Sequence, residues 1–130
     1  MSSIFSKVIS GELPSYTILE DDDHLAFLDI NPLARGHVLV IPKKQTDYIF
    51  DINTLEYLAL WKFTKKVAQA INKSFKCKRV GIAVIGLEVP HTHIHLVPIN
   101  SLEDLDFSRP KLKLSNIDFE KDMNLIKSII

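Results

Sequence analysis

The chain has 130 residues, in which 16 lysines and arginines balance 16 aspartates and glutamates. This length fits one domain, residues 1–130, whose core buries roughly two thirds of the surface that the unfolded chain exposes. The balanced charge gives no general field for nucleic acid, for an anionic membrane or for a strongly acidic partner, and we expect none of these partners.

The chain carries no sign of an oxidising or membrane environment. Its single cysteine, Cys77, cannot form an internal disulfide, and the start MSSIFSKVIS lacks the long apolar core of a secretory signal. No apolar run approaches the ~20 residues that a membrane-spanning helix needs. We therefore expect a soluble, cytoplasmic protein.

The first predicted element is a short amphipathic helix near the N-terminus. Four apolar residues fall on one stripe at helical spacing: Ile4, Phe5, Val8 and Ile9. Gly11 and Pro14 then end the helix.

Three predicted strands follow this helix. Residues 16–20 and 24–30 flank three aspartates, 21–23, and this turn-favouring cluster indicates a hairpin. His24 lies outside every motif, and we expect it at a solvated strand end. After a loop, the β-branched and almost wholly apolar run 37–42 is typical of a strand that is covered on both faces and ends at a proline.

The longest predicted element is a helix that starts after Asn53. Asn53 can cap this helix, with Glu56 as its reciprocal partner three residues later. A solvent-facing stripe at intervals of three and four comprises Lys62, Lys65, Lys66, Gln69 and Lys73. The apolar residues that lie largely off this stripe are Leu55, Leu58, Val67, Ala70 and Ile71.

Two further strands and a helix complete the predicted fold. The strands cover residues 80–85 and 91–97, and Ser115 or Asn116 can cap a C-terminal helix. Its apolar contacts would come from Ile117, Phe119, Met123 and Ile126. We predict an α+β domain: an antiparallel sheet of about five strands with the long helix packed on one face, plus short N-terminal and C-terminal helices.

The last predicted strand has histidine at every second position: His91, His93 and His95. Because side chains on a strand alternate between faces, the three rings would share one face, while Ile94 and Leu96 would point to the long helix. Burial of three imidazoles without partners would be costly. We therefore expect the rings to line a surface or a cleft.

A metal site is one interpretation of this row of histidines. An HxH pair can bind one zinc ion, but the backbones of His91 and His95 are roughly 13 Å apart on a strand, so the third ring reaches the ion with difficulty. His37 or Glu88 would have to complete the site, and we predict no metal site. An extended phosphate substrate fits better, because it offers several oxygens to hold and one phosphorus to attack, and imidazole is a nucleophile near pH 7.

The run from His91 to Val97, HTHIHLV, resembles the signature of the histidine triad (HIT) family. IFSKVISGELP near the start, LAFLDINPLARGHVLVIPKK at 25–44 and the long helix precede it in the order expected for that family. The resemblance covers about residues 1–100 and implies a HIT-like fold. The length and the three intact histidines are similar to the small nucleotide-binding, Hint-like branch, whereas the uridylyltransferase branch usually has glutamine in place of His95.

This resemblance implies hydrolysis at the α-phosphorus of purine nucleotides, commonly phosphoramidates, through a covalent nucleotidyl-histidine and without a cofactor. By position the nucleophile is His93. His91 and His95 would orient it, hold phosphate oxygens and help to protonate the leaving group, and His37 matches a supporting histidine behind the triad. The similar family members are homodimers, so the resemblance also implies a homodimer.

The base and ribose sites follow by the same resemblance. The positions that match an apolar slot for a purine are Ile4, Phe5, Val8, Phe27, Leu28 and Ile30, and Asp29 matches the acid that binds ribose hydroxyls. Each assignment has a structural alternative. The first three could instead anchor the N-terminal helix to the core, and Asp29 could initiate a turn.

Phosphate binding departs from the family pattern at two positions. Many relatives have asparagine and serine or threonine where this chain has Val80 and Glu88. We count Glu88 and its neighbour Val89 among the nucleotide-binding candidates, and we expect the Glu88 carboxylate to point aside or to contact the leaving group. Arg35 and the pair Lys43 and Lys44 could attract phosphate, or they could serve only solubility.

Two other functions stay open. One is the hydrolysis of dinucleoside polyphosphates, as in the neighbouring Fhit-like branch. The other is a nucleotide-binding scaffold whose catalysis is incidental. The choice between adenine and guanine also stays open, because apolar walls hold both bases.

Overall fold

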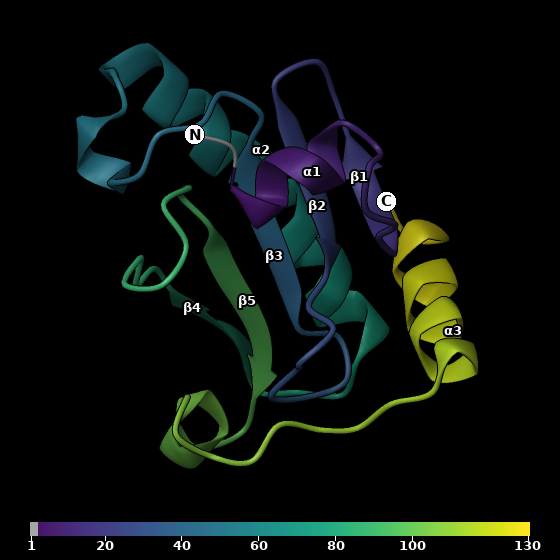
Figure 1. Cartoon of the computed structure of the whole chain (residues 1–130). Helices are drawn as coiled ribbons and strands as arrows, with labels where there is room; N and C mark the ends of the chain where they lie inside the picture. Colours follow the sequence, from purple (N-terminus) through teal and green to yellow (C-terminus); the bar gives the residue numbers. More distant parts are fainter. Residues whose placement is uncertain (1–2) are drawn as a thin grey trace.

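Five strands form one antiparallel sheet in the computed structural model, which describes residues 3–130 (Figure 1). Their order across the sheet is β1-β2-β3-β5-β4. Their bounds are β1 Thr17–Glu20, β2 His24–Leu28, β3 Val38–Pro42, β4 Arg79–Ala83 and β5 Ile94–Ile99. The predicted α+β class and the number of strands are therefore confirmed.

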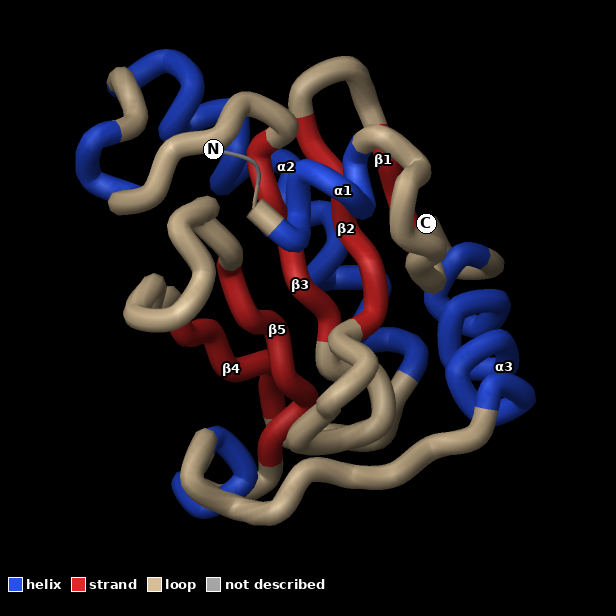
Figure 2. Tube along the Cα trace, viewed as in Figure 1, coloured by secondary structure: helices blue, strands red, loops and turns tan. Residues whose placement is uncertain are grey.

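Three α-helices and two short 3-10 helices surround this sheet. Helix α1 (Ile4–Ile9) lies in front of it, α2 (Thr54–Ser74) lies behind it, and α3 (Asn116–Lys127) lies beside β1 (Figures 1 and 2). The 3-10 helices are η1 (Ile49–Asp51) and η2 (Leu102–Leu105). No helix within residues 3–130 is long and apolar enough to cross a bilayer.

The alternation of side chains along the strands builds one apolar cluster on each face. On the α2 face, Ala26, Leu28, Val38, Val40, Ile94 and Leu96 pack with Leu60, Phe63, Val67 and Ile71 of the helix. On the α1 face, Leu25, Phe27, Leu39 and Ile41 pack with Phe5. The run 37–42 is thus covered on both faces, as its sequence predicts, and Ile94 and Leu96 lie beneath α2.

Side chains cap the helices at the predicted positions, with one difference. Ser115 caps α3 and forms a full capping box with Asp118. The Asn53 side chain accepts the Glu56 N–H at 3.0 Å, as predicted. The reciprocal bond from the Glu56 side chain was expected, but its carboxylate instead pairs with Lys44 Nζ at 3.4 Å.

Some residues lie elsewhere than the sequence predicts. His24 is buried rather than solvated, because its Nδ1 bonds the Asp21 carboxylate at 3.0 Å and its ring packs on Phe63. Ile117 is exposed and makes no core contact, whereas Phe119 and Ile126 of the same helix are buried. Leu55 and Leu58, near the start of α2, are also exposed because this part of the helix extends beyond the core.

Gly36 shapes the loop between β2 and β3, which leads directly into His37. Its φ of +86° lies in the left-handed region that disfavours other residues. A Cβ atom added to Gly36 would lie 2.6 Å from the Phe75 ring. The loop can therefore turn beneath this ring only with glycine at position 36.

Candidate active site

The three histidines of the triad lie at the start of β5 rather than along it. Only His95 is on the strand, where it is opposite Leu39 of β3 and Ala83 of β4. The predicted start of the strand at residue 91 is wrong, because the chain there bonds to loops instead of neighbouring strands. The Thr92 N–H and hydroxyl both donate to the Thr46 carbonyl at 2.7 Å, and the His91 N–H donates to Val89 O at 2.8 Å.

His91 is fully buried, and both of its ring nitrogens have partners. The Pro42 carbonyl can only accept, so His91 Nε2 carries the proton and donates at 2.7 Å, while Nδ1 accepts from the Ser3 hydroxyl at 2.8 Å. Burial lowers the pKa of His91, outweighing the bond to Pro42 that raises it. No ring nitrogen of His91 is free for a phosphate oxygen, so the expected phosphate contact of this ring is not available.

His93 receives its orientation from the backbone of His91. Its Nδ1 donates to the His91 carbonyl at 2.8 Å, which places the proton of the neutral ring on Nδ1 and leaves the lone pair on Nε2. The Phe5 ring packs edge-on against the imidazole, with the ring centroids 5.0 Å apart. His93 also lines a cavity of about 390 Å³. The ring is thus held in one tautomer and is not sealed in the core.

His95 forms a relay with the buried His37. The Leu33 N–H donates to His37 Nδ1 at 2.9 Å, so the proton of His37 is on Nε2, which lies 3.0 Å from His95 Nδ1. His37 therefore donates to His95, and the proton of His95 is on Nε2, its remaining nitrogen. Burial lowers the pKa of His37 to about 3 and that of His95 to about 4, so both rings are neutral at pH 7.

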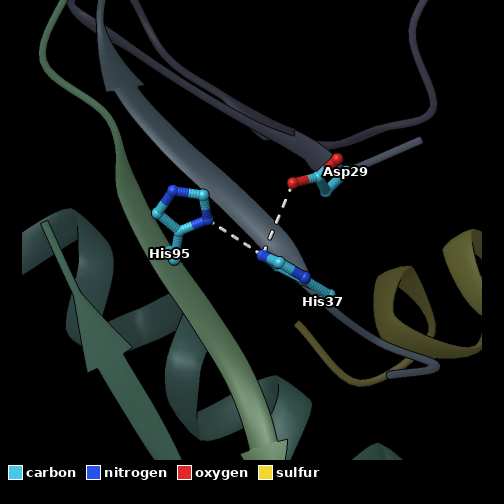
Figure 3. Close-up of side chains that lie close together, drawn as sticks. All are labelled: Asp29, His37 and His95. Carbon is cyan, nitrogen blue, oxygen red and sulfur yellow. Dashed lines mark hydrogen bonds and ion pairs between the residues drawn. The ribbon is translucent and has the colours of Figure 1, made fainter. Parts of the chain in front are cut away.

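Asp29 joins this relay from the end of β2. Figure 3 shows His37 between Asp29 and His95, with the carboxylate oxygen Oδ2 3.5 Å from His37 Nε2. The other oxygen, Oδ1, accepts a hydrogen bond from the Asn31 N–H at 2.8 Å. This bond forms the turn that was the alternative role of Asp29 in the sequence. Burial raises the pKa of Asp29 above its ordinary value, against the opposing effects of Asn31, His93 and Lys111.

Asp29, His37 and His95 are also close enough to be considered as metal ligands, because one ligand atom from each lies within 4.8 Å of the others. A metal at His37 Nε2 would need the lone pair of that nitrogen and would move the ring proton to Nδ1. The Leu33 N–H already points at Nδ1, so two N–H groups would then face each other. The hydrogen bonds of His37 thus favour a proton relay over a metal site.

The structure brings three of the six residues predicted for the base slot to the face that carries the triad. Phe5 and Phe27 pack edge-on at 5.8 Å beside the histidines, and Val8 and Val89 border the same cluster. Ile4 and Ile30 are more than half exposed. The Leu28 side chain instead lies in the cluster beneath α2, so this residue can reach the triad face only through its backbone.

The charged residues that the sequence offers as possible phosphate or nucleotide contacts have other partners or make no contact with the triad in the described structure. Arg35 binds Asp122 of α3 through two bonds of 2.6 and 2.8 Å. Lys43 pairs with Glu20 at 2.7 Å, and Lys44 pairs with Glu56. Glu88 is exposed on the loop before the triad, and it has no hydrogen bond or ion pair among those of residues 3–130. None of these groups is presented to the triad by a contact in the described structure.

Comparison with known proteins gives the same family as the triad motif. A family model of the HIT domain matches residues 10–102. This chain belongs to the HIT family. Within the family, an uncharacterised HIT-like protein of Borreliella burgdorferi is 38% identical, over 97% of this chain and 94% of its own length.

Two other HIT proteins inform the comparison. An adenosine 5'-monophosphoramidase of Schizosaccharomyces pombe is 32% identical over 75% of this chain and 74% of its own length. The crystal structure of a HIT-like protein from Bartonella henselae aligns with a TM-score of 0.86 at 30% identity, and covers 99% of this chain and 96% of its own. The fold of this chain is therefore the HIT fold, in a family whose members are generally hydrolases.

Four groups beside the HIT triad are not found by reasoning from the sequence. The Ser3 hydroxyl donates to His91 Nδ1, the Leu33 amide fixes the tautomer of His37, and Phe107 packs on His95 with 4.7 Å between the ring centroids. Lys111 acts electrostatically on His37 and His95. Phe107 and Lys111 lie beyond the HIT match and have no motif around them, so no local pattern signals either of them.

Proposed function

We propose that this HIT protein is a hydrolase and nucleotidyl transferase that cleaves at the α-phosphate of purine nucleotides, with nucleoside phosphoramidates as its substrate type. The orientation of His93 is the main support. With the proton on Nδ1 and bonded to the His91 carbonyl, the lone pair of Nε2 is the nucleophile. The name of the S. pombe relative indicates the same chemistry for that protein.

The reaction proceeds in two displacements at phosphorus. His93 Nε2 forms a bond to the α-phosphorus as the phosphorus–nitrogen bond to the leaving amine breaks, and the amine leaves with the electron pair and takes a proton from solvent. The positive charge that develops on His93 is stabilised by its Nδ1–H bond to the His91 carbonyl. Water then attacks the phosphorus and gives a proton to solvent, the electron pair of the breaking bond returns to Nε2, and the nucleoside monophosphate is released.

The other histidines would support this attack from fixed positions. His95 Nε2–H donates to a phosphoryl oxygen, and His37 holds the tautomer that makes this possible. His91 acts as a positioning residue through its carbonyl. Ile4, Phe5, Val8, Phe27 and Ile30 would contact the purine, the carboxylate of Asp29 would bind the ribose hydroxyls, and Glu88 with Val89 would border the leaving group.

The test is the release of AMP or GMP from a nucleoside phosphoramidate by the wild type and by His93→Ala. Loss of the nucleophile should lower the rate by at least ~10³-fold, as removal of a covalent catalyst generally does. His24→Asn changes the one histidine that lies outside this network and should keep the rate of the wild type. Equal rates for the wild type and His93→Ala would refute the proposed mechanism.

The cavity beside His93 favours dinucleoside polyphosphates as a second candidate substrate. Its walls include four aromatic residues, Tyr48, Phe50, Tyr57 and Trp61, and the Trp61 indole N–H has no hydrogen-bond partner within residues 3–130. Such walls suit a second base. A ratio of kcat/KM values for diadenosine polyphosphates and phosphoramidates would rank the two classes, and tight AMP binding without turnover of either would indicate a binding protein instead.

We also propose a homodimer that pairs through β4. This strand is at the edge of the sheet, where its outer side has no neighbouring strand among the described residues. The large apolar side chains exposed on β4 and on the segments around the aromatic cavity are Tyr48, Phe50, Leu55, Leu58, Ile82, Ile85 and Leu87. An exposed edge with apolar surroundings favours pairing with a second chain, and sedimentation equilibrium measures whether it occurs.

A further inference from the structure

The chain between η2 and α3 passes close to the relay formed by His37 and His95. Figure 2 shows this loop running from η2 past the end of the sheet that holds the loop between β2 and β3. The Leu112 N–H donates to the Pro32 carbonyl in that loop at 2.8 Å. The Phe107 ring packs edge-on against His95, and its centroid lies 6.2 Å from the centroid of the His37 ring. Residues 107–112 therefore cover the relay from a region beyond the HIT match.

Lys111 is held within this loop by the backbone. Its ammonium group donates to the carbonyls of Phe107 and Arg109, the latter at 3.1 Å. These bonds use two of its three N–H groups and leave one. Within residues 3–130, no carboxylate lies within 4.0 Å of the Lys111 ammonium, in contrast to Arg35, Lys43 and Lys44. Its positive charge is thus held in place but not neutralised.

The charge of Lys111 acts on three groups of the site. After the larger effect of burial, Lys111 helps to lower the pKa of His37 and of His95, and it favours the ionised form of Asp29. Asp29 and the two histidines come from different segments, so the charge of Lys111 acts on the site as a whole. Apart from Lys111, the described site would present imidazole rings and the Asp29 carboxylate to an anionic phosphate.

We propose that Lys111 is a phosphate-binding residue, whose free N–H donates to an oxygen of the anionic phosphate held at the triad. This inference rests on the proposed nucleotide function and adds a residue to it. Val80 and Glu88 provide no neutral donor at the two positions where relatives have one. The backbone carbonyls that fix Lys111 also lower the entropy lost when the ammonium binds an anion.

The test compares the binding of AMP with that of adenosine by calorimetry, since adenosine has the same base and ribose but no phosphate. Lys111→Gln keeps a donor for the carbonyls of Phe107 and Arg109 but removes the charge. It should weaken AMP binding by about 10-fold, the usual worth of a charge-assisted hydrogen bond, and leave adenosine binding unchanged. Lys111→Arg should restore most of the preference for AMP.

Lys113→Gln is the matched control, because Lys113 is exposed two residues further along the same loop. It should bind AMP and adenosine as the wild type does. If Lys111→Gln keeps the wild-type ratio of AMP to adenosine affinity, or weakens both ligands equally, Lys111 does not bind phosphate. If this result is obtained while the wild type hydrolyses phosphoramidates, only the role of Lys111 is overturned. If the wild type binds no nucleotide, the proposed function is overturned as well.

Discussion

The tautomer of each triad histidine depends on a backbone group that can play only one part in a hydrogen bond, directly for His91 and His93 and through His37 for His95. The Pro42 and His91 carbonyls can only accept, and the Leu33 amide can only donate. These three backbone groups determine which nitrogen of His91, His93 and His37 carries the proton. Because His37 Nε2–H donates to His95 Nδ1, the proton of His95 is on Nε2. The backbone around His93 therefore determines that the lone pair of its neutral ring is on Nε2.

The relay can be tested by replacing His37. Glutamine places an amide N–H near the position of His37 Nε2 and should keep the tautomer of His95, whereas methionine has a similar length but no donor. We expect kcat for a phosphoramidate to fall about 10-fold in His37→Met, because the donor on His95 is no longer held toward the phosphoryl group. His37→Gln should keep most of the rate.

Nitrogen-15 NMR of the histidine rings gives a second measurement for these variants. His95 should show a proton on Nε2 in the wild type and in His37→Gln, and a mixture of tautomers in His37→Met. A His95 tautomer and a rate that are unchanged in His37→Met would show that His37 only fills space.

The sequence predicts which residues carry the chemistry but not which groups orient them. The alternation of His91, His93 and His95 is visible locally and predicts their role. Ser3 is 88 positions away from His91, and its hydroxyl reaches the ring only because α1 packs on the triad face. The Leu33 amide belongs to the backbone, so no side-chain pattern can signal it.

At the scale of elements, α1 connects the N-terminal residues to the triad. Ser3 caps the helix in a capping box with Ser6, and the same Ser3 hydroxyl donates to His91 Nδ1. Phe5, the second residue of the helix, packs against His91 and His93. The helix has only six residues, so these contacts rather than its own hydrogen bonds hold it in place.

Ser3→Ala removes a cap and leaves the buried Nδ1 of His91 without a donor. We expect the free energy of unfolding to fall by about 2 kcal/mol, which combines the loss of a cap and of one buried hydrogen bond. Urea denaturation measures this change. Ser10→Ala, at the exposed end of the same helix, should cost much less, and equal losses in the two variants would contradict a link between Ser3 and the triad.

Strands and helices follow from the sequence where a regular pattern is long enough. The α2 cap at Asn53 and the covered strand β3 are examples, because capping and apolar alternation are local properties. The segment 91–93 has the alternation of a strand, yet its backbone bonds to Thr46 and Val89. A strand in a sheet and an extended loop can have the same alternation of side chains. They differ only in the partners of their backbone hydrogen bonds, which lie elsewhere in the chain.

For the whole molecule, the buried neutral histidines make stability depend on pH. His37 and His95 have pKa values of about 3 and about 4 in the folded state, against an ordinary value of 6.5. At pH values between 4 and 6.5, these two histidines bind protons in the unfolded chain but not in the folded chain. Their contribution to stability is therefore complete above pH 6.5 and is lost as the pH falls toward 4.

We expect the free energy of unfolding to decrease from pH 6.5 to pH 5, by about 1.4 kcal/mol per pH unit for each of the two histidines. The lowered pKa of His91 adds to this slope, whereas the raised pKa of Asp29 opposes it. Urea denaturation at pH 7, 6 and 5 at constant ionic strength measures the slope. A stability that is constant or increases on acidification would contradict buried, neutral His37 and His95.

The bond between Ser3 and His91 has a practical consequence for how the protein is handled. A purification tag joined ahead of Met1 begins only a few residues from the hydroxyl that donates to His91, so a bulky fusion there would act on this bond. Ile130 follows α3, which lies beside β1, the edge strand that β2 and β3 separate from β5 (Figure 1). Affinity handles, fluorophores and surface-immobilisation linkers therefore belong on the C-terminal end.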